Sequence, residues 1–125
     1  MIPKFRAWNT FHNKWVKHFY ITENGLIYNM EQPHRDLIGA VPIEKSGLVV
    51  MQSTGLFDKN GKEIFEGDVV NIFGEKLSKI YYSDGAFCVD ILIGGTPLHA
   101  FLSEQLEIIG NIHRNPELME EVLND

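Results

Sequence analysis

The amino-acid sequence predicts a mainly β protein, in which an N-terminal β element rich in hairpins precedes a small barrel with a short C-terminal helix. Three observations support this fold class. β-branched and aromatic residues occur in short runs separated by turns rich in Gly, Asp, Asn and Pro, a spacing typical of small barrels and rolls. Residues 54–72 join a tight turn to the beginning of a core strand. The last residues have the spacing of a helix.

The length and the cysteine content limit the class of protein. A chain of 125 residues is long enough to bury a core without disulfides. The single cysteine, Cys88, excludes an internal disulfide framework and is typical of a reducing compartment. The sequence opens without a charged-then-apolar leader, and no apolar run approaches the length of a membrane span. We therefore expect a cytoplasmic protein that does not associate with membranes.

The net charge of −6 is divided unevenly along the chain. Residues 1–62 contain 8 Lys and Arg against 5 Asp and Glu, whereas residues 63–125 contain 3 against 12. The first part therefore carries a charge of +3 and the second −9. Because opposite charges on one small molecule can attract a second copy, we expect a homo-oligomer.

The N-terminal element is expected to contain three strands. A short aromatic run at residues 5–8 forms the first. Residues 15–21 alternate as one continuous strand, with the odd-numbered side chains on one side. Asn24 and Gly25 predict a two-residue type I′ turn, in which both central residues have positive φ. Residues 26–30 form the returning strand.

A Pro- and Gly-rich connection separates this element from the rest of the chain. Residues 31–47 contain two prolines and two glycines, which are too closely spaced for a long regular element, although residues 36–40 could form a helical turn. We therefore divide the chain into residues 1–47, the N-terminal β element with its connection, and residues 48–125, the small barrel with its helix.

The barrel begins with an apolar strand at residues 48–52. Asp58 and Gly61 delimit a predicted tight turn, because the aspartate can bond its own backbone two residues on and the glycine can adopt positive φ. A second bend at Gly67 precedes a β-branched strand that starts near Val69.

A hairpin is expected next, with strands at residues 77–82 and 86–93 joined by a three-residue loop that ends in Gly85. Residues 94–97 are expected to turn the chain and residues 98–102 to return it as a strand.

The end of the chain combines a last strand with a helix. Residues 106–109 form the final apolar run. Asn115 is a favourable N-cap and Pro116 suits the first helical position. Leu118 and Val122 lie one turn apart, so the helix has one apolar face. Such a short helix must dock on the barrel to persist.

The basic, aromatic-rich N-terminus supplies candidate nucleic-acid contacts. Lysine and arginine can bind phosphates, and aromatic rings can stack on unpaired bases. The alternative, which we favour, is that the aromatic residues form a hairpin core and the lysines its solvated edge. The candidate contacts are Lys4, Arg6, Trp8, Lys14 and Trp15, with Phe11, Lys17 and Tyr20 near them in the sequence.

The sequence predicts no metal site, no cofactor site and no catalytic residues. Residues 58–69 are not a calcium loop, because Lys62 replaces an oxygen ligand and Val69 replaces the closing glutamate. Cys88 has apolar neighbours, which favour an inert thiol. Residues 94–97 lack the lysine and the following helix of a phosphate-binding loop. The histidines lack the spacing of zinc ligands; they are His12, His18, His34, His99 and His113.

Three stretches of the chain share the order and residues of one known family. They are residues 4–8, 51–70 and 109–118, which together extend over nearly the whole chain. The chain resembles the YopX family, small proteins encoded by bacteriophages and prophages. The resemblance implies a phage or prophage origin and a C-terminal barrel of the SH3 type, with residues 66–70 entering its first strand. It implies no catalytic residue, substrate or cofactor.

We therefore expect a non-enzymatic phage or prophage accessory protein that self-associates and binds a phage or host protein in the bacterial cytoplasm. The alternative is a small-barrel protein that binds nucleic acid through its basic N-terminus. A third hypothesis is an enzyme whose site is assembled from residues distant in the sequence.

Overall fold

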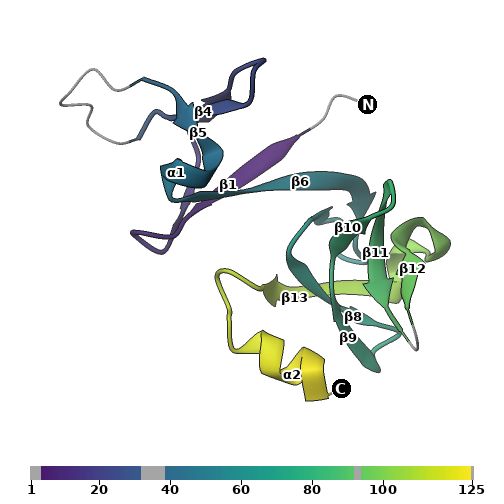
Figure 1. Ribbon diagram of the computed structural model, residues 1–125. Helices are drawn as coiled ribbons and strands as arrows, with labels where there is room; N and C mark the ends of the chain where they lie inside the picture. Colours follow the sequence, from purple (N-terminus) through teal and green to yellow (C-terminus); the bar gives the residue numbers. More distant parts are fainter. Residues whose placement is uncertain (1–3, 32–38, 92–93, 125) are drawn as a thin grey trace. The chain divides into compact units, whose positions relative to one another are not determined.

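The computed structural model describes residues 4–31, 39–91 and 94–124 of the chain (Figure 1). The chain forms two compact units. The N-terminal unit comprises residues 5–51, and the C-terminal unit comprises residues 1–4 and 52–125. The division between them falls within strand β6 (Leu48–Phe57), a single strand of 10 residues.

The N-terminal unit contains short antiparallel strands and one turn of helix. Strand β1 pairs with β2 on one side and is followed in the sheet by β6, while β4 pairs with β3 and β5 in a second sheet. The elements are β1 (Phe5–Asn9), β2 (Lys14–Val16), β3 (Phe19–Ile21), β4 (Leu26–Asn29), β5 (Val41–Pro42), α1 (Ile43–Ser46) and the first residues of β6.

The core of this unit draws side chains from both sheets. Its fully buried members are Ala7, Val16, Ile27 and Leu48, and the partly buried Phe19, Ile21, Val41, Ile43 and Val50 pack against them.

The prediction of one continuous strand at residues 15–21 is wrong. The chain forms β2 and β3, which pair with different strands. Val16 and Phe19 would face opposite sides of an uninterrupted strand, yet both belong to the N-terminal core. The break at Lys17 and His18 lets both Val16 and Phe19 face the core. At the break, the Lys17 N–H donates to Glu31 Oε2 at 3.1 Å.

The hairpin at Asn24 and Gly25 exists, but its turn is not type I′. Gly25 has a φ of 85° while Asn24 keeps a negative φ. The Gly25 N–H donates to the Thr22 carbonyl at 3.0 Å, and the Thr22 N–H donates to the Leu26 carbonyl at 2.8 Å. The turn therefore spans more residues than predicted, and only the glycine adopts the left-handed conformation. Of the predicted helical turn at residues 36–40, residues 36–38 lie outside the described residues.

The C-terminal unit is built from two three-stranded antiparallel sheets and the pair formed by β6 and β7. One sheet has the order β13-β8-β9 and the other β10-β11-β12, and together they curl into a half-barrel (Figure 1). The elements are β7 (Glu63–Phe65), β8 (Asp68–Ile72), β9 (Lys76–Lys79), β10 (Tyr81–Ser83), β11 (Ala86–Asp90), β12 (Gly95–Pro97), the 3₁₀ turns η1 (Leu98–Ala100) and η2 (Ser103–Gln105), β13 (Leu106–Asn111) and helix α2 (Leu118–Asn124).

The core of the half-barrel is aliphatic. β-branched residues alternate along β8 and supply much of it, as expected for a strand with a buried face. The fully buried members are Ile64, Val70, Ile72, Ile80, Val89, Leu98 and Leu106.

The turn at Asp58 is confirmed in detail. Asp58 Oδ1 accepts the N–H of Asn60 and the N–H of Lys62, each at 2.9 Å. Gly61 has a φ of 77°. The predicted local chemistry therefore forms as expected.

The predicted strand at residues 77–82 is divided at Ile80. Strand β9 pairs with β8, whereas β10 pairs with β11. Ile80 is buried at the corner, its N–H donates to the Asp68 carbonyl at 2.8 Å, and its carbonyl accepts the Gly67 N–H at 2.9 Å. A strand that leaves one sheet for another at a bend is one way in which small barrels curl.

The connections after this corner also differ from the prediction. The β10–β11 loop has two residues, because Ser83 pairs with Ala86, and both Asp84 and Gly85 have positive φ, which is the type I′ turn. Residues 95–97, predicted as a turn, form β12 and pair with β11. Residues 98–100, predicted as part of a strand, form η1, which places Leu98 in the core. Strand β11 ends at Asp90, and residues 92–93 of the strand predicted at 86–93 lie outside the described residues.

The C-terminal helix is confirmed, with a later start than predicted. Helix α2 begins at Leu118, and Asn115 Oδ1 accepts the Asn111 N–H at 3.2 Å instead of capping the helix. The prediction of a mainly β protein with a small curled barrel-type sheet and a short C-terminal helix is therefore confirmed. No helix in the described residues is long and apolar enough to span a membrane.

Candidate functional site

The candidate nucleic-acid residues on β1 and β2 form a cation–aromatic cluster. Trp8 and Trp15 are directly opposite across the two strands, with ring centroids 5.0 Å apart and planes at 78°. The Arg6 guanidinium carbon lies 4.4 Å from the centre of the Trp15 ring. Trp8 is only 6% exposed. These contacts stabilise the hairpin and reduce the ring surface that a base could reach.

The two lysines of the candidate set have separate positions. Lys14 is exposed on β2, which lies at the edge of its sheet. Lys4 belongs to the C-terminal unit, where its Nζ lies 3.3 Å from Glu63 Oε1. The structure therefore brings Arg6, Trp8 and Trp15 into contact and pairs Lys4 with a carboxylate.

The charge of the N-terminal unit is a second indication of how well this unit could bind the phosphates of a nucleic acid. Residues 5–51 contain 5 Lys and Arg against 4 Asp and Glu. Nucleic-acid-binding domains are usually far more basic on the binding face.

Of the neighbouring aromatic residues, Tyr20 stacks on Tyr28 with ring centroids 5.1 Å apart. One face of the Tyr20 ring is therefore already covered within the unit.

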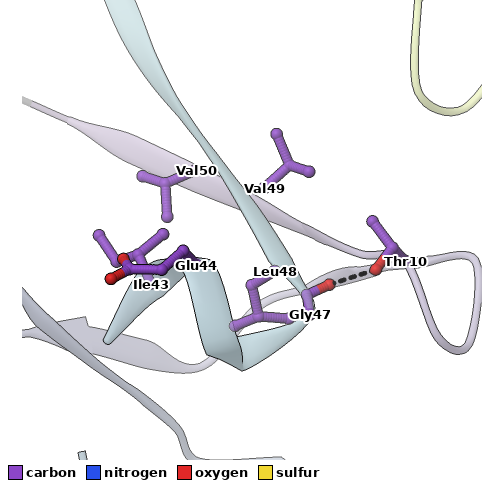
Figure 2. Close-up of a pocket in the computed structure, with 7 residues that line it drawn as sticks. All are labelled: Thr10, Ile43, Glu44, Gly47, Leu48, Val49 and Val50. Atoms are coloured by element: carbon purple, nitrogen blue, oxygen red, sulfur yellow. Dashed lines mark hydrogen bonds between the residues drawn. The ribbon is translucent and has the colours of Figure 1, made fainter. Parts of the chain in front are cut away.

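An open apolar pocket lies in the same unit between α1 and β6 (Figure 2). Its volume is about 540 Å³. Figure 2 shows Ile43 and Glu44 of the helical turn on the same side of the strand as Val50, with Val49 on its other side and Thr10 at the other end. The lining residues are Thr10, Ile43, Glu44, Gly47, Leu48, Val49 and Val50.

Gly47 lines this pocket and also contacts the ring of the exposed residue Phe11. The residue ends α1 with a φ of 75°, and its carbonyl accepts both the N–H and the Oγ1–H of Thr10, at 2.9 and 2.6 Å. A Cβ at this position would overlap the ring of Phe11, which is 68% exposed. The ring therefore lies directly on Gly47 and extends the apolar surface. We call this surface the apolar patch; it comprises the exposed Phe11 and the partly exposed Ile43, Gly47, Val49 and Val50.

The sequence did not predict the apolar patch, because residues 48–52 indicate only an apolar strand. A local signal existed. A glycine that follows a short run capable of helix is typical of a helix C-terminus, and it would have placed a helical turn beside that strand.

Both carboxylate oxygens of Asp58 accept hydrogen bonds from the protein's own backbone. Asp58 is 2% exposed, and besides its two turn bonds its Oδ2 accepts the Ile108 N–H at 2.9 Å. Burial raises the pKa of this carboxyl, but the N–H groups of Ile108, Lys62 and Asn60 outweigh that effect and hold the pKa below 3.8. The segment is a turn, as predicted, and its aspartate is a structural acceptor.

Two further carboxylates also have structural partners. Asp68 Oδ2 accepts the Phe65 N–H at 2.8 Å, and Asp68 Oδ1 accepts from Asn111 Nδ2 at 3.2 Å. The Ser53 hydroxyl donates to Glu63 Oε2, and this bond, together with Lys4, lowers the pKa of Glu63 below 4.5.

The remaining candidate ligands do not converge. In the described part of the chain, no three His, Cys, Asp or Glu side chains are grouped as metal ligands. Cys88 is buried, and its Sγ lies 3.6 Å from the Ala86 carbonyl oxygen. His34 lies outside the described residues. Residues 95–97, considered as part of a phosphate-binding turn, belong to β12.

Comparisons with known proteins identify the family to which the chain belongs. The family described as YopX protein matches residues 4–120. The crystal structure of protein EF1440 from Enterococcus faecalis matches 95% of this chain and 99% of that one, with 31% identity and a TM-score of 0.68. The X-ray structure of protein yopX from Bacillus subtilis matches 91% of this chain and 95% of that one, with 20% identity and a TM-score of 0.60, a likeness of fold. The search of curated proteins found no match. Because the family match extends over most of its length, the chain belongs to the YopX family.

Proposed function

We propose that this protein is a non-enzymatic accessory protein of a bacteriophage or prophage that acts in the bacterial cytoplasm, self-associates, and binds a phage or host protein. The observation that carries the proposal is the apolar patch. The patch joins the exposed Phe11 to the partly exposed Ile43, Val49 and Val50, and contiguous apolar surface marks an interaction site more often than scattered single side chains do.

The patch has the physical features of a contact surface. Except for Phe11, which lies in the turn between β1 and β2, its residues come from a strand and a helical turn that are fixed by hydrogen bonds, so little conformational freedom would be lost on association. Phe11 adds a large exposed ring at its edge, and aromatic residues are enriched at the centres of interfaces. A second copy of the chain is the occupant that we propose.

Charge favours an arrangement in which unlike units of two copies meet. The C-terminal unit contains 6 Lys and Arg against 13 Asp and Glu, whereas the N-terminal unit contains 5 against 4. An N-terminal unit therefore meets less repulsion from the C-terminal unit of another copy than two C-terminal units meet from each other.

The buried aspartates Asp58 and Asp68 support the non-enzymatic part of the proposal. Asp58 and Asp68 each accept several hydrogen bonds from the fold itself. A general acid or base needs a carboxyl whose bonding capacity is available to substrate. The acids that burial could have tuned for catalysis are thus engaged in holding turns and strands together.

Analytical ultracentrifugation of the full chain tests self-association. We expect the wild-type protein to sediment as an oligomer at micromolar concentration, and Val49→Asp to sediment as a monomer because it introduces a charge into the patch. Met30→Asp is the matched control, since Met30 is exposed in the same unit outside the patch. A monomeric wild-type protein, or equal dissociation by both variants, would contradict the proposal.

The same protein can be titrated with single-stranded and duplex oligonucleotides at two salt concentrations. The proposal expects no binding at either concentration. Binding that weakens steeply with salt and is lost in Lys14→Ala would instead favour the alternative, a nucleic-acid-binding protein whose candidate contacts are Lys4, Arg6, Trp8, Lys14 and Trp15.

A further inference from the structure

A second pocket lies wholly within the C-terminal unit, where the β8–β9 turn approaches η2 and the start of β13. Its volume is about 350 Å³, enough for a side chain or a small ligand. None of the sequence motifs pointed to it. Its lining residues are Lys59, Asn71, Phe73, Gly74, Glu104, Gln105, Leu106 and Glu107.

An acceptor without a partner lies in the wall of this pocket. Asn71 Oδ1 is buried and makes no hydrogen bond. Asn71 is directly opposite Glu107 in the pairing of β8 with β13, so the two side chains share one face of the sheet. A buried amide oxygen with no donor costs stability, so a donor brought by a ligand would be favourable at this position.

Phe73 adds a strained aromatic group at the rim. Phe73 and Gly74 have φ values of 57° and 72°, and the Glu75 N–H donates to the Ile72 carbonyl at 3.0 Å, which is the geometry of a type I′ turn. Asn, Asp or Gly normally occupies the first of these positions. A phenylalanine there strains the backbone by adopting a left-handed conformation, and the residue is 55% exposed. Strain of this kind is concentrated at binding sites.

The charges around the pocket favour a cation. Glu104 and Glu107 bring two negative charges, and Lys59 Nζ lies 3.5 Å from Glu107 Oε2 and offsets one of them. The unit as a whole carries 13 acidic against 6 basic residues. A cationic group would therefore be attracted to the pocket and held by its carboxylates.

We infer that this pocket binds the guanidinium group of an arginine side chain on a protein partner. A guanidinium presents five N–H donors in a plane, so it can donate to a carboxylate of the pocket and, when the neighbouring side chains shift to uncover it, to Asn71 Oδ1 at the same time. It also stacks on an aromatic ring such as Phe73, and it loses less hydration on entering a pocket than a lysine ammonium does. The inference adds the chemistry of a partner to the proposed function, and it uses residues outside the apolar patch.

An NMR titration with the peptide Ac-Ala-Arg-Ala-NH2 tests this site without reference to oligomeric state. We expect amide shifts at residues 71–74 and 104–107 at millimolar peptide. The corresponding citrulline peptide has the same shape without the charge, and it is expected to bind at least tenfold more weakly. The lysine peptide is expected to bind several-fold more weakly. Equal shifts with either control peptide, or no shifts with the arginine peptide, would overturn the inference.

Variants separate binding from stability. Asn71→Val removes the unpartnered oxygen, so it is expected to raise Tm while weakening arginine-peptide binding at least tenfold. A lower Tm would show that the amide serves the fold and would overturn the assignment. Glu104→Gln is expected to weaken binding several-fold, whereas Glu117→Gln, an exposed site outside the pocket, makes the same charge change and is expected to leave binding unchanged. Loss of self-association in Val49→Asp leaves this titration unaffected.

Discussion

At the scale of single residues, Asp58 contributes more to the fold than its place in a surface turn implies. Its two carboxylate oxygens accept three backbone N–H groups, two within the turn and one from Ile108 in β13. Asp58→Asn keeps one of the two acceptor oxygens, so either the turn or the bond to Ile108 loses its acceptor. We expect a loss of about 1–3 kcal/mol in the free energy of unfolding, measured by urea denaturation at pH 7.

The pH dependence of stability provides the control for this prediction. The pKa of Asp58 is lower in the folded protein than its ordinary value of 3.8, so the unfolded chain binds the proton more readily. The contribution is therefore complete above the unfolded-state pKa and is lost as pH falls through the folded-state pKa. Wild-type stability should decrease more steeply than that of Asp58→Asn as pH falls below about 5. Parallel decreases in the two proteins would contradict the assignment.

Tyr81 shows the opposite direction of shift. Its hydroxyl donates to Asp90 Oδ1 at 2.5 Å, and this bond, with burial and the charge of Asp90, raises the pKa of Tyr81 to about 12. The stabilisation is complete below the ordinary pKa of 10.0 and is lost as pH rises through the folded-state value. In ultraviolet titration, Tyr81→Phe should lack an ionisation step near pH 12.

Asp90→Asn tests the cause of that shift, because it removes the charge while keeping an oxygen that can accept the bond. The Tyr81 step should move to lower pH in this variant. A step at the same pH in wild type and Asp90→Asn would show that Asp90 does not raise the Tyr81 pKa.

At the scale of elements, the docking of α2 depends on the absence of a side chain at Gly110 in β13. A Cβ there would lie 2.5 Å from Leu118 Cδ1 and 2.7 Å from Asn115 Oδ1. Helix α2 contacts β9 and is too short to persist alone. Gly110→Ala is therefore expected to displace the helix and to cost about 1–3 kcal/mol, with reduced helical signal in circular dichroism.

Gly39→Ala is the matched control for this substitution. A Cβ at Gly39 would meet no atom within 4 Å, and the change should alter stability by less than about 0.5 kcal/mol. If the two alanine variants have equal stability, close packing at Gly110 is not what positions the helix.

The elements also show what could be predicted from the sequence. The turn at Asp58–Gly61 was predictable because its hydrogen bonds join residues two to four positions apart. The breaks at Lys17–His18 and Ile80 were not, because each arises where a strand changes its pairing partner, and partner choice depends on residues distant in the chain. The later start of α2 likewise follows from the bond between Asn115 and the Asn111 N–H, which competes with the predicted cap.

The two pockets could not be predicted from local sequence patterns, for the same reason. The pocket that we propose to bind arginine is lined by residues from positions 59, 71–74 and 104–107. No short motif encodes that combination. The one local anomaly was a phenylalanine before Gly74, in a turn position that normally takes Asn, Asp or Gly. The candidate aromatic residues near the N-terminus were found, but only the structure shows that Trp8 is buried and that Arg6 covers the Trp15 ring.

At the scale of the whole molecule, the uneven charge predicts how salt affects self-association. If attraction between unlike units contributes, raising the salt concentration from 50 to 500 mM should weaken the oligomer by at least several-fold, because the Debye length falls from above about 10 Å to a few ångströms. Sedimentation equilibrium at both concentrations measures this. An apolar contact alone would be unchanged or strengthened by salt, so a constant affinity would leave the apolar patch as the entire basis of association.

The bond between Asp58 Oδ2 and the Ile108 N–H joins residues 50 positions apart, and this has a consequence for synthesis on the ribosome. A nascent chain that has emerged only as far as β12 already contains Asp58 but lacks the donor that satisfies its second oxygen. The half-barrel can then close only after β13 has emerged, and premature termination before β13 should yield a product that chaperones retain or proteases degrade.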